Sequence, residues 1–81
     1  MSYEVRISPA AESALAALPY RIGTAAVNFM QRELRERPYE VGLALRGGLG
    51  GHLVARRGQY RIVYSVNTDA KTIDIVHVTQ H

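Results

Sequence analysis

The fold is decided by residues 52–66, which have the sequence HLVARRGQYRIVYSV. In residues 60–66, large apolar side chains recur at every second position, which is the period of a strand with one buried face. Gly58-Gln59 forms a two-residue connection with glycine in first place, as is typical of a β-hairpin. We therefore predict strands at 52–57 and 60–66 that pair with each other.

Alternation assigns the side chains of this hairpin to two faces. Leu53, Ala55 and Arg57 share one face, which is the buried face because Leu53 and Ala55 are the better core pair, and the apolar row of the second strand belongs to it too. That row consists of Tyr60, Ile62, Tyr64 and Val66. His52 and Arg56 then share the opposite face with Arg61. Two arginines on one face of adjacent strands favour a binding site for an anion over two unrelated surface charges.

Further strands are predicted on both sides of the hairpin. Residues 67–70 form a turn that leads into a strand at 72–78. Near the start of the chain, residues 3–7 alternate apolar with charged side chains, as a half-buried strand does.

Two helices lie between the first strand and the hairpin. Ser8 is placed as the N-cap of the first helix and Pro9 as its first residue, and Pro19 ends it. The second runs from Tyr20 to about residue 37 and has an apolar stripe that includes Phe29 and Met30, which we assign to the core. The order is β-α-α-β-β-β in a single domain, residues 1–81. We expect an α+β fold with a helical hairpin packed on a small, mainly antiparallel four-stranded sheet.

The glycine-rich stretch lies in a predicted loop, residues 38–51. A phosphate-binding loop of the Walker type ends in Gly-Lys-Ser/Thr, and a dinucleotide fingerprint opens a helix. Neither pattern follows residues 47–51, so we interpret these glycines as a connection between elements.

Composition limits the classes of protein that the chain can represent. Its 81 residues are 47% hydrophobic and 21% charged, as in a small globular domain. Cysteine is absent, so disulfides and thiolate chemistry are excluded, which fits the reducing cytoplasm. The first residues lack the apolar core of a signal peptide, and no apolar run is long enough to span a bilayer. We expect a soluble, cytoplasmic protein without a membrane partner.

The net charge of +3 resides in the second half of the chain. Between Glu40 and Asp69 there is no acidic residue. The basic side chains of this stretch are Arg46, His52, Arg56, Arg57 and Arg61. Arginine suits two-point contact with phosphate or carboxylate, so we expect a polyanionic partner, either nucleic acid or an acidic protein.

The chain resembles the RelE/ParE superfamily of bacterial toxins from type II toxin–antitoxin pairs, and it is more RelE-like than ParE-like. The resemblance covers essentially all 81 residues and is most specific in two pieces, LRG at 45–47 and HLVARRGQYRIVY at 52–64. The fold implied by the resemblance agrees with the order derived above.

The resemblance implies a toxin that is a ribosome-dependent messenger RNA endonuclease. Such enzymes cut messenger RNA in the ribosomal decoding site, inhibit translation, and are silenced by a cognate antitoxin in a hetero-oligomer. In RelE-like enzymes the arginine that corresponds to Arg61 helps to bind the scissile phosphate. His81 takes the place of a second arginine of the family.

Metal-free RNA cleavage needs a base for the 2′-OH, cations around the phosphorane, and an acid for the leaving 5′ oxygen. Arg61 and Arg56 are our candidates for the cations, and His52 and His81 for the proton transfers. The RNA-binding candidates are Arg46, Arg56, Arg57 and Arg61. We interpret His77 as a strand residue. Because the histidines lack acidic companions at ligand spacing, we expect neither a metal site nor a cofactor.

Three departures from the RelE pattern leave two other functions open. Val54 stands where a nuclease can have a lysine, His81 replaces an arginine, and the functional tyrosine of the family's tail is absent. One alternative is a ParE-like inhibitor that binds DNA gyrase without catalysis. The other is a degenerate toxin that binds its antitoxin without cleaving RNA.

Overall fold

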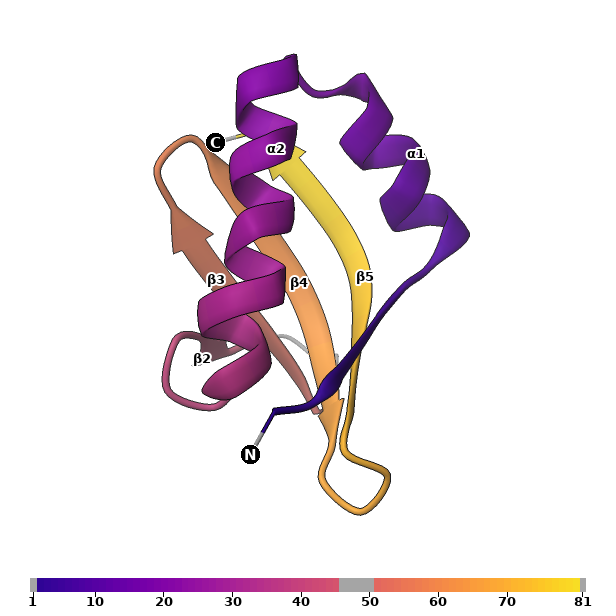
Figure 1. Ribbon diagram of the computed structural model, residues 1–81, viewed down its shortest axis with the longest axis vertical. Helices are drawn as coiled ribbons and strands as arrows, with labels where there is room; N and C mark the ends of the chain where they lie inside the picture. Colours follow the sequence, from indigo (N-terminus) through magenta and orange to yellow (C-terminus); the bar gives the residue numbers. More distant parts are fainter. Residues whose placement is uncertain (1, 46–50, 81) are drawn as a thin grey trace.

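The computed structural model describes residues 2–45 and 51–80. Within these ranges the chain forms helices and strands in the order shown in Figure 1. They are β1 (Glu4–Ile7), α1 (Pro9–Ala17), α2 (Tyr20–Phe29), the π-helical turn η1 (Met30–Leu34), β2 (Leu43–Ala44), β3 (His52–Arg57), β4 (Tyr60–Asn67) and β5 (Thr72–Gln80).

The strands form one sheet in the order β1-β5-β4-β3-β2. β1 pairs in parallel with β5, and the other neighbours are antiparallel. The α+β class and the helical hairpin are confirmed, but the predicted strand count of four is wrong by one. Leu43 and Ala44, which lie in the predicted loop, pair with Val54 and Leu53. Two residues are too few for alternation to be visible in the sequence.

Both helices begin and end close to the predicted positions. The Ser8 hydroxyl accepts a hydrogen bond from the Ala11 N–H at 3.1 Å and so caps α1. After α2, η1 and a final helical turn carry the chain to Glu36. In the described ranges, no helix combines the length and the apolar character needed to cross a bilayer.

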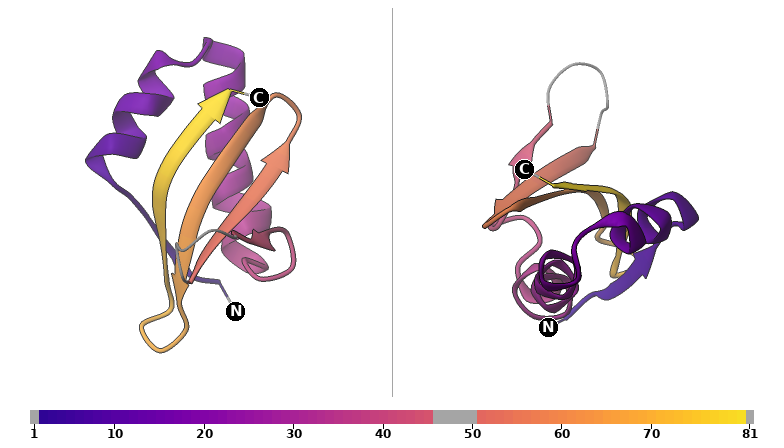
Figure 2. Two further views of the ribbon diagram at one scale, coloured as in Figure 1. Left: turned by 180° about the vertical axis from the view of Figure 1, so that it is seen from behind. Right: turned by 90° about the horizontal axis from the view of Figure 1, so that it is seen from above.

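The helices cover one face of the sheet and leave the other uncovered (Figures 1 and 2). The core lies between the two layers, where the ring centroids of Phe29 and Tyr60 are 6.2 Å apart. Its buried apolar side chains are Ala11, Ala26, Phe29, Met30, Leu34, Ala55, Tyr60, Ile62, Tyr64, Ile73, Ile75 and Val78. The predicted apolar row of the hairpin therefore faces the helices, and Phe29 and Met30 belong to the core as predicted.

A β-bulge interrupts the pairing of β4 with β5. Val63 is opposite His77, but the next residue, Tyr64, is opposite Ile75. Val76 is thus an extra residue in β5, and its carbonyl oxygen accepts a hydrogen bond from the Ser8 hydroxyl at 3.3 Å. The bulge reverses the alternation of β5 beyond this point.

Candidate functional site

The face of the sheet that the helices leave uncovered is called the open face below (Figure 2). Three of the six predicted site residues lie on it, as the strand register shows. Residues that lie opposite each other in a sheet project to the same side. The register of β3 and β4 pairs His52 with Ser65, Val54 with Val63, and Arg56 with Arg61. His52, Arg56 and Arg61 therefore lie on the open face, as alternation predicts.

Arg56 and Arg61 carry like charges at directly opposite positions of two neighbouring strands. The Leu45 N–H donates to the His52 carbonyl oxygen at 2.9 Å, so the N–H and C=O groups of His52 point toward β2. Because backbone groups alternate in direction along a strand, those of Val54 and Arg56 point to the same side, away from β4. Arg56 and Arg61 are then a non-hydrogen-bonded pair, in which opposite Cα atoms are about 4.5 Å apart and the side chains are closest.

Like charges in this arrangement are destabilising. Thr79 is opposite Arg61 on the other side and extends the row. Among the described residues, no acidic side chain belongs to this row. An anion held between the two guanidinium groups would replace their repulsion by charge-assisted hydrogen bonds. The pair is therefore suited to bind a phosphate group.

Two further rows cross the open face beside the arginine pair. The middle row is mostly apolar and contains Leu43, Val54, Val63 and His77. The third row is polar and contains His52, Ser65, Asp74 and Arg6. In this third row the Arg6 Nε and Asp74 Oδ1 atoms are 3.7 Å apart, so the acid already has a cationic neighbour.

The two histidines of the open face differ in position. His52 is half-buried, and its buried Nδ1 has no hydrogen-bond partner in the part of the chain that the structure describes. His77 is exposed and lies next to the arginine row. The sequence contains one weak indication that His77 is exposed. Strict alternation from Ile73 and Ile75 would bury the polar His77, which is a sign that the alternation is broken.

Arg57 lies on the opposite face and contacts the helix layer. Its guanidinium carbon is 5.1 Å from the centroid of the Phe29 ring, and its Nη2 is 3.8 Å from a carboxylate oxygen of Glu33. Its Nη1 also donates to the Arg56 carbonyl oxygen at 2.9 Å. The structure thus puts Arg57 on the face opposite Arg56 and Arg61, as alternation predicts, although the sequence analysis listed all three as RNA-binding candidates.

Arg46 and His81, the other two predicted site residues, lie outside the described residues. In residues 2–45 and 51–80, no group of three or more histidine, cysteine, aspartate and glutamate side chains is arranged to hold a metal ion.

Two buried tyrosines fix β4, the strand that carries Arg61. The Tyr64 hydroxyl donates to the Pro38 carbonyl oxygen at 2.6 Å, and burial raises the pKa of Tyr64 to about 12, although Arg57 acts in the opposite direction. The Tyr60 hydroxyl donates to the Ala25 carbonyl oxygen at 3.4 Å. Burial also raises the pKa of Tyr60, against the effect of Arg57. Both phenols are thus held neutral, as buried donors.

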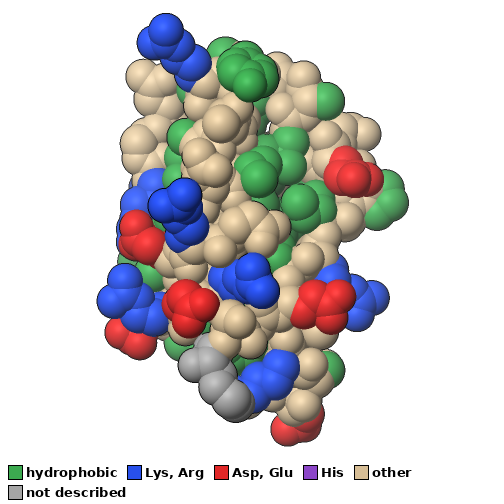
Figure 3. All heavy atoms as spheres, in the orientation of Figure 1, with side chains coloured by type: hydrophobic (Ala, Val, Ile, Leu, Met, Phe, Trp, Pro, Cys, Tyr) green, Lys and Arg blue, Asp and Glu red, His purple; other side chains and the backbone are tan. Residues whose placement is uncertain are grey.

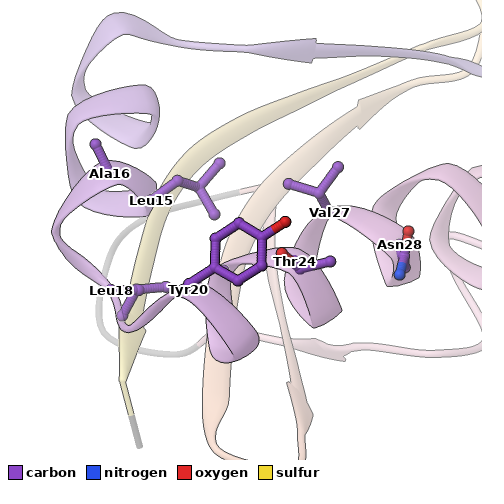
Figure 4. A pocket seen from close by; sticks show the side chains of 8 residues that line it. Leu15, Ala16, Leu18, Tyr20, Thr24, Val27 and Asn28 are labelled. Carbon is purple, nitrogen blue, oxygen red and sulfur yellow. The ribbon is translucent and has the colours of Figure 1, made fainter.

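The helix side of the molecule has a different character. Figure 3 shows acidic side chains interspersed with basic ones there, and apolar side chains gathered between α1 and α2. A groove of about 520 Å³ lies at this place (Figure 4). Its lining includes Leu15, Leu18, Val27 and the largely exposed Tyr20, but no charged residue. This groove is suited to an apolar segment and not to an anion.

Known proteins resemble the chain over nearly its whole length. The Toxin RelE of Mycobacterium tuberculosis is 36% identical over 78 residues, which are 96% of this chain and 80% of the relative. The Toxin RelG of the same organism is 40% identical over 78 residues, 96% of this chain and 90% of the relative. A chain in the crystal structure of the toxin–antitoxin complex RelBE2 from Mycobacterium tuberculosis has a TM-score of 0.96 and 37% identity, with 100% of both chains covered. No protein-family model matches the sequence.

Proposed function

The chain belongs to the RelE family of toxins from type II toxin–antitoxin pairs, and from this premise we propose that it is an endonuclease that cuts messenger RNA on the ribosome. The reaction is a metal-independent transesterification at phosphorus. Because ribosomes are its site of action, the toxin works in the cytoplasm and inhibits translation there.

The arginine pair of the open face is the observation that carries this proposal. During cleavage the 2′ oxygen attacks the phosphorus atom, and the phosphorane that forms carries one more negative charge than the phosphodiester. Preorganised cations stabilise such a transition state more than the ground state. Arg56 and Arg61 lie opposite each other on rigid strands, so their guanidinium groups need little rearrangement to hold the phosphorane oxygens.

A cognate antitoxin is the second partner that we propose. The RelBE2 structure is a complex of a toxin with its antitoxin. The chain has a net charge of +3, and the open face contains the close arginine pair. An antitoxin segment that places carboxylates over Arg56 and Arg61 would neutralise the pair and exclude RNA from it. Toxin and antitoxin then form a hetero-oligomer whose assembly weakens as salt concentration rises.

The test is induced expression in a bacterium, with the 5′ ends of transcripts mapped and plasmid supercoiling measured in the same cells. Wild type should arrest growth and cut translated messages within codons. Arg61→Ala and Arg56→Ala should each reduce cutting, by about a hundredfold for a preorganised donor. Arg57→Ala is the matched control, because it removes an arginine from the same hairpin but from the other face.

Growth arrest with intact messages would contradict the nuclease. One observation favours the gyrase inhibitor as second candidate: the middle row of the open face is apolar at Val54 and Val63, and Leu43 is 76% exposed there. Such a row suits contact with a protein. Altered supercoiling without RNA cuts would identify that function. Antitoxin binding without growth arrest would identify a degenerate toxin.

A further inference from the structure

The bulge at Val76 brings His77 to the open face. Ile73 and Ile75 are fully buried, so uninterrupted alternation would turn His77 toward the core. Because Val76 is an extra residue, His77 is instead opposite Val63 and exposed to solvent. Bulges occur often next to active sites, where they redirect a side chain.

His77 is placed close to the arginine pair. Arg61 is opposite Thr79, and His77 precedes Thr79 by two residues on the same face. Arg61 and His77 are therefore diagonal neighbours, at about 7–8 Å between their backbones. Both side chains are long enough to contact one phosphodiester that lies over this corner of the sheet.

His52 occupies a less suitable place. It lies four residues from Arg56 along β3, a separation of about 13 Å at the rise of a strand. It is also half-buried, whereas His77 is exposed. Among the described residues, His77 is thus the imidazole that the register puts nearest to the arginine pair.

We propose that His77 is the general acid of the cleavage reaction, an inference that rests on the function proposed above. The 2′ oxygen forms a bond to phosphorus and releases its proton to solvent water. The bond from phosphorus to the 5′ oxygen breaks, and the imidazolium of His77 gives its proton to that oxygen. The products are a 2′,3′-cyclic phosphate and a 5′-hydroxyl end, and His77 regains a proton from solvent.

The surroundings of His77 define which charges act on it. β4 presents Arg61 diagonally and the neutral Val63 directly opposite, and β3 presents Arg56 beyond Arg61. On its own strand the nearest acid is Asp74, which lies beside Arg6 of β1. A bound phosphate would be the closest anion to the imidazole.

The test uses ribosomes programmed with a messenger RNA that has sulfur in place of the 5′ bridging oxygen at the linkage that wild type cuts. A thiolate leaves without being protonated, so it needs no general acid. His77→Gln should cut the normal RNA about a hundredfold more slowly, as expected for loss of a general acid. The same variant should cut the sulfur-containing RNA within about threefold of wild type, and its Tm should be unchanged because the side chain is exposed.

His52→Gln and His81→Gln are the comparison variants. Rescue by sulfur that is confined to His77→Gln supports the proposal. Three results would overturn the role of His77 without contradicting the endonuclease function. They are equal slowing of His77→Gln on both RNAs, unchanged cutting of the normal RNA by His77→Gln, and rescue by sulfur of His81→Gln instead of His77→Gln. If wild type cuts neither RNA, the endonuclease function fails, and the role of His77 fails with it.

Discussion

Substitution of Gly42 by alanine should destabilise the protein strongly, although glycine-to-alanine changes are usually mild. A Cβ atom at this position would overlap the Tyr64 hydroxyl and would lie 3.0 Å from the Tyr64 Cζ and 3.2 Å from the Val54 carbonyl oxygen. Tyr64 is fully buried and donates to Pro38 at 2.6 Å, so its ring cannot swing into solvent. The residue just before β2 must therefore lack a side chain.

The size of the effect follows from two contributions. A Tyr64 hydroxyl that is pushed from Pro38 leaves a buried donor and a buried acceptor unpaired, which costs about 1–3 kcal/mol. A methyl group forced into a packed core costs about 1–3 kcal/mol more. We expect a loss of about 3 kcal/mol or more, which corresponds to a Tm lower by roughly 15 °C for a domain of this size.

Urea and thermal unfolding of four variants check this prediction. Gly23→Ala is the matched control, because its Cβ would meet only the Leu15 carbonyl oxygen at 3.4 Å and the Leu18 Cβ at 4.0 Å. In a helix this change should stabilise by about 0.5–1 kcal/mol. In a Tyr64→Phe background, Gly42→Ala should cost at least about 1 kcal/mol less than alone, since the overlapping oxygen is gone. A Gly42→Ala protein as stable as wild type, or strict additivity with Tyr64→Phe, would refute the reasoning.

Three further outcomes are expected. The folded protein should lose stability between pH 10 and pH 12, because the unfolded chain ionises Tyr64 at its ordinary pKa of 10.0 while the folded chain holds the pKa at about 12. This contribution reaches about 3 kcal/mol, and Tyr64→Phe, measured by unfolding at each pH, should show a smaller decline. Arg57→Gln should lower the stability by about 1 kcal/mol or less, since its contacts with Glu33 and Phe29 are half-exposed, and a growth assay should show full toxicity. Ser8→Ala should cost about 1 kcal/mol in thermal unfolding through loss of the helix cap. Ser8→Asp should retain most of the wild-type stability, because its carboxylate still accepts from the Ala11 N–H although it cannot donate to the Val76 carbonyl oxygen.

The parts of the fold that follow from the sequence are those with a strong local signal. Gly58-Gln59, which separates two alternating segments, determines the register of β3 and β4, and this register places Arg56 opposite Arg61. Ser8-Pro9 likewise determines the start of α1. In both cases a few adjacent residues restrict the backbone directly, so one sequence is sufficient to place the element.

The features that the sequence does not reveal depend on contacts between distant segments. β2 exists because Leu43 and Ala44 lie beside β3, and the bulge at Val76 depends on how β5 fits β4 and on the hydrogen bond from Ser8. The charge of Arg57 and its position in the chain suggest an RNA-binding residue. Its side chain lies on the face that is covered by the helices, where it contacts Phe29 of α2 and Glu33 of η1. Alternation does place Arg57 on the face opposite Arg56, but a pattern with a period of two does not reveal these contact partners.

The two faces of β4 separate the residues that stabilise the fold from those of the proposed site. Tyr60 and Tyr64 are anchored on the helix side by hydrogen bonds to Ala25 and Pro38, so the register of the strand is set by buried groups. Arg61 inherits its position from that register, and its side chain forms no ion pair with the residues that the structure describes. Like charges on directly opposite strand positions are unfavourable, and an anion bound between Arg56 and Arg61 would relieve this repulsion. The strand therefore holds two cations in an arrangement that folding alone does not favour, which is the expected state of a site preorganised for phosphate.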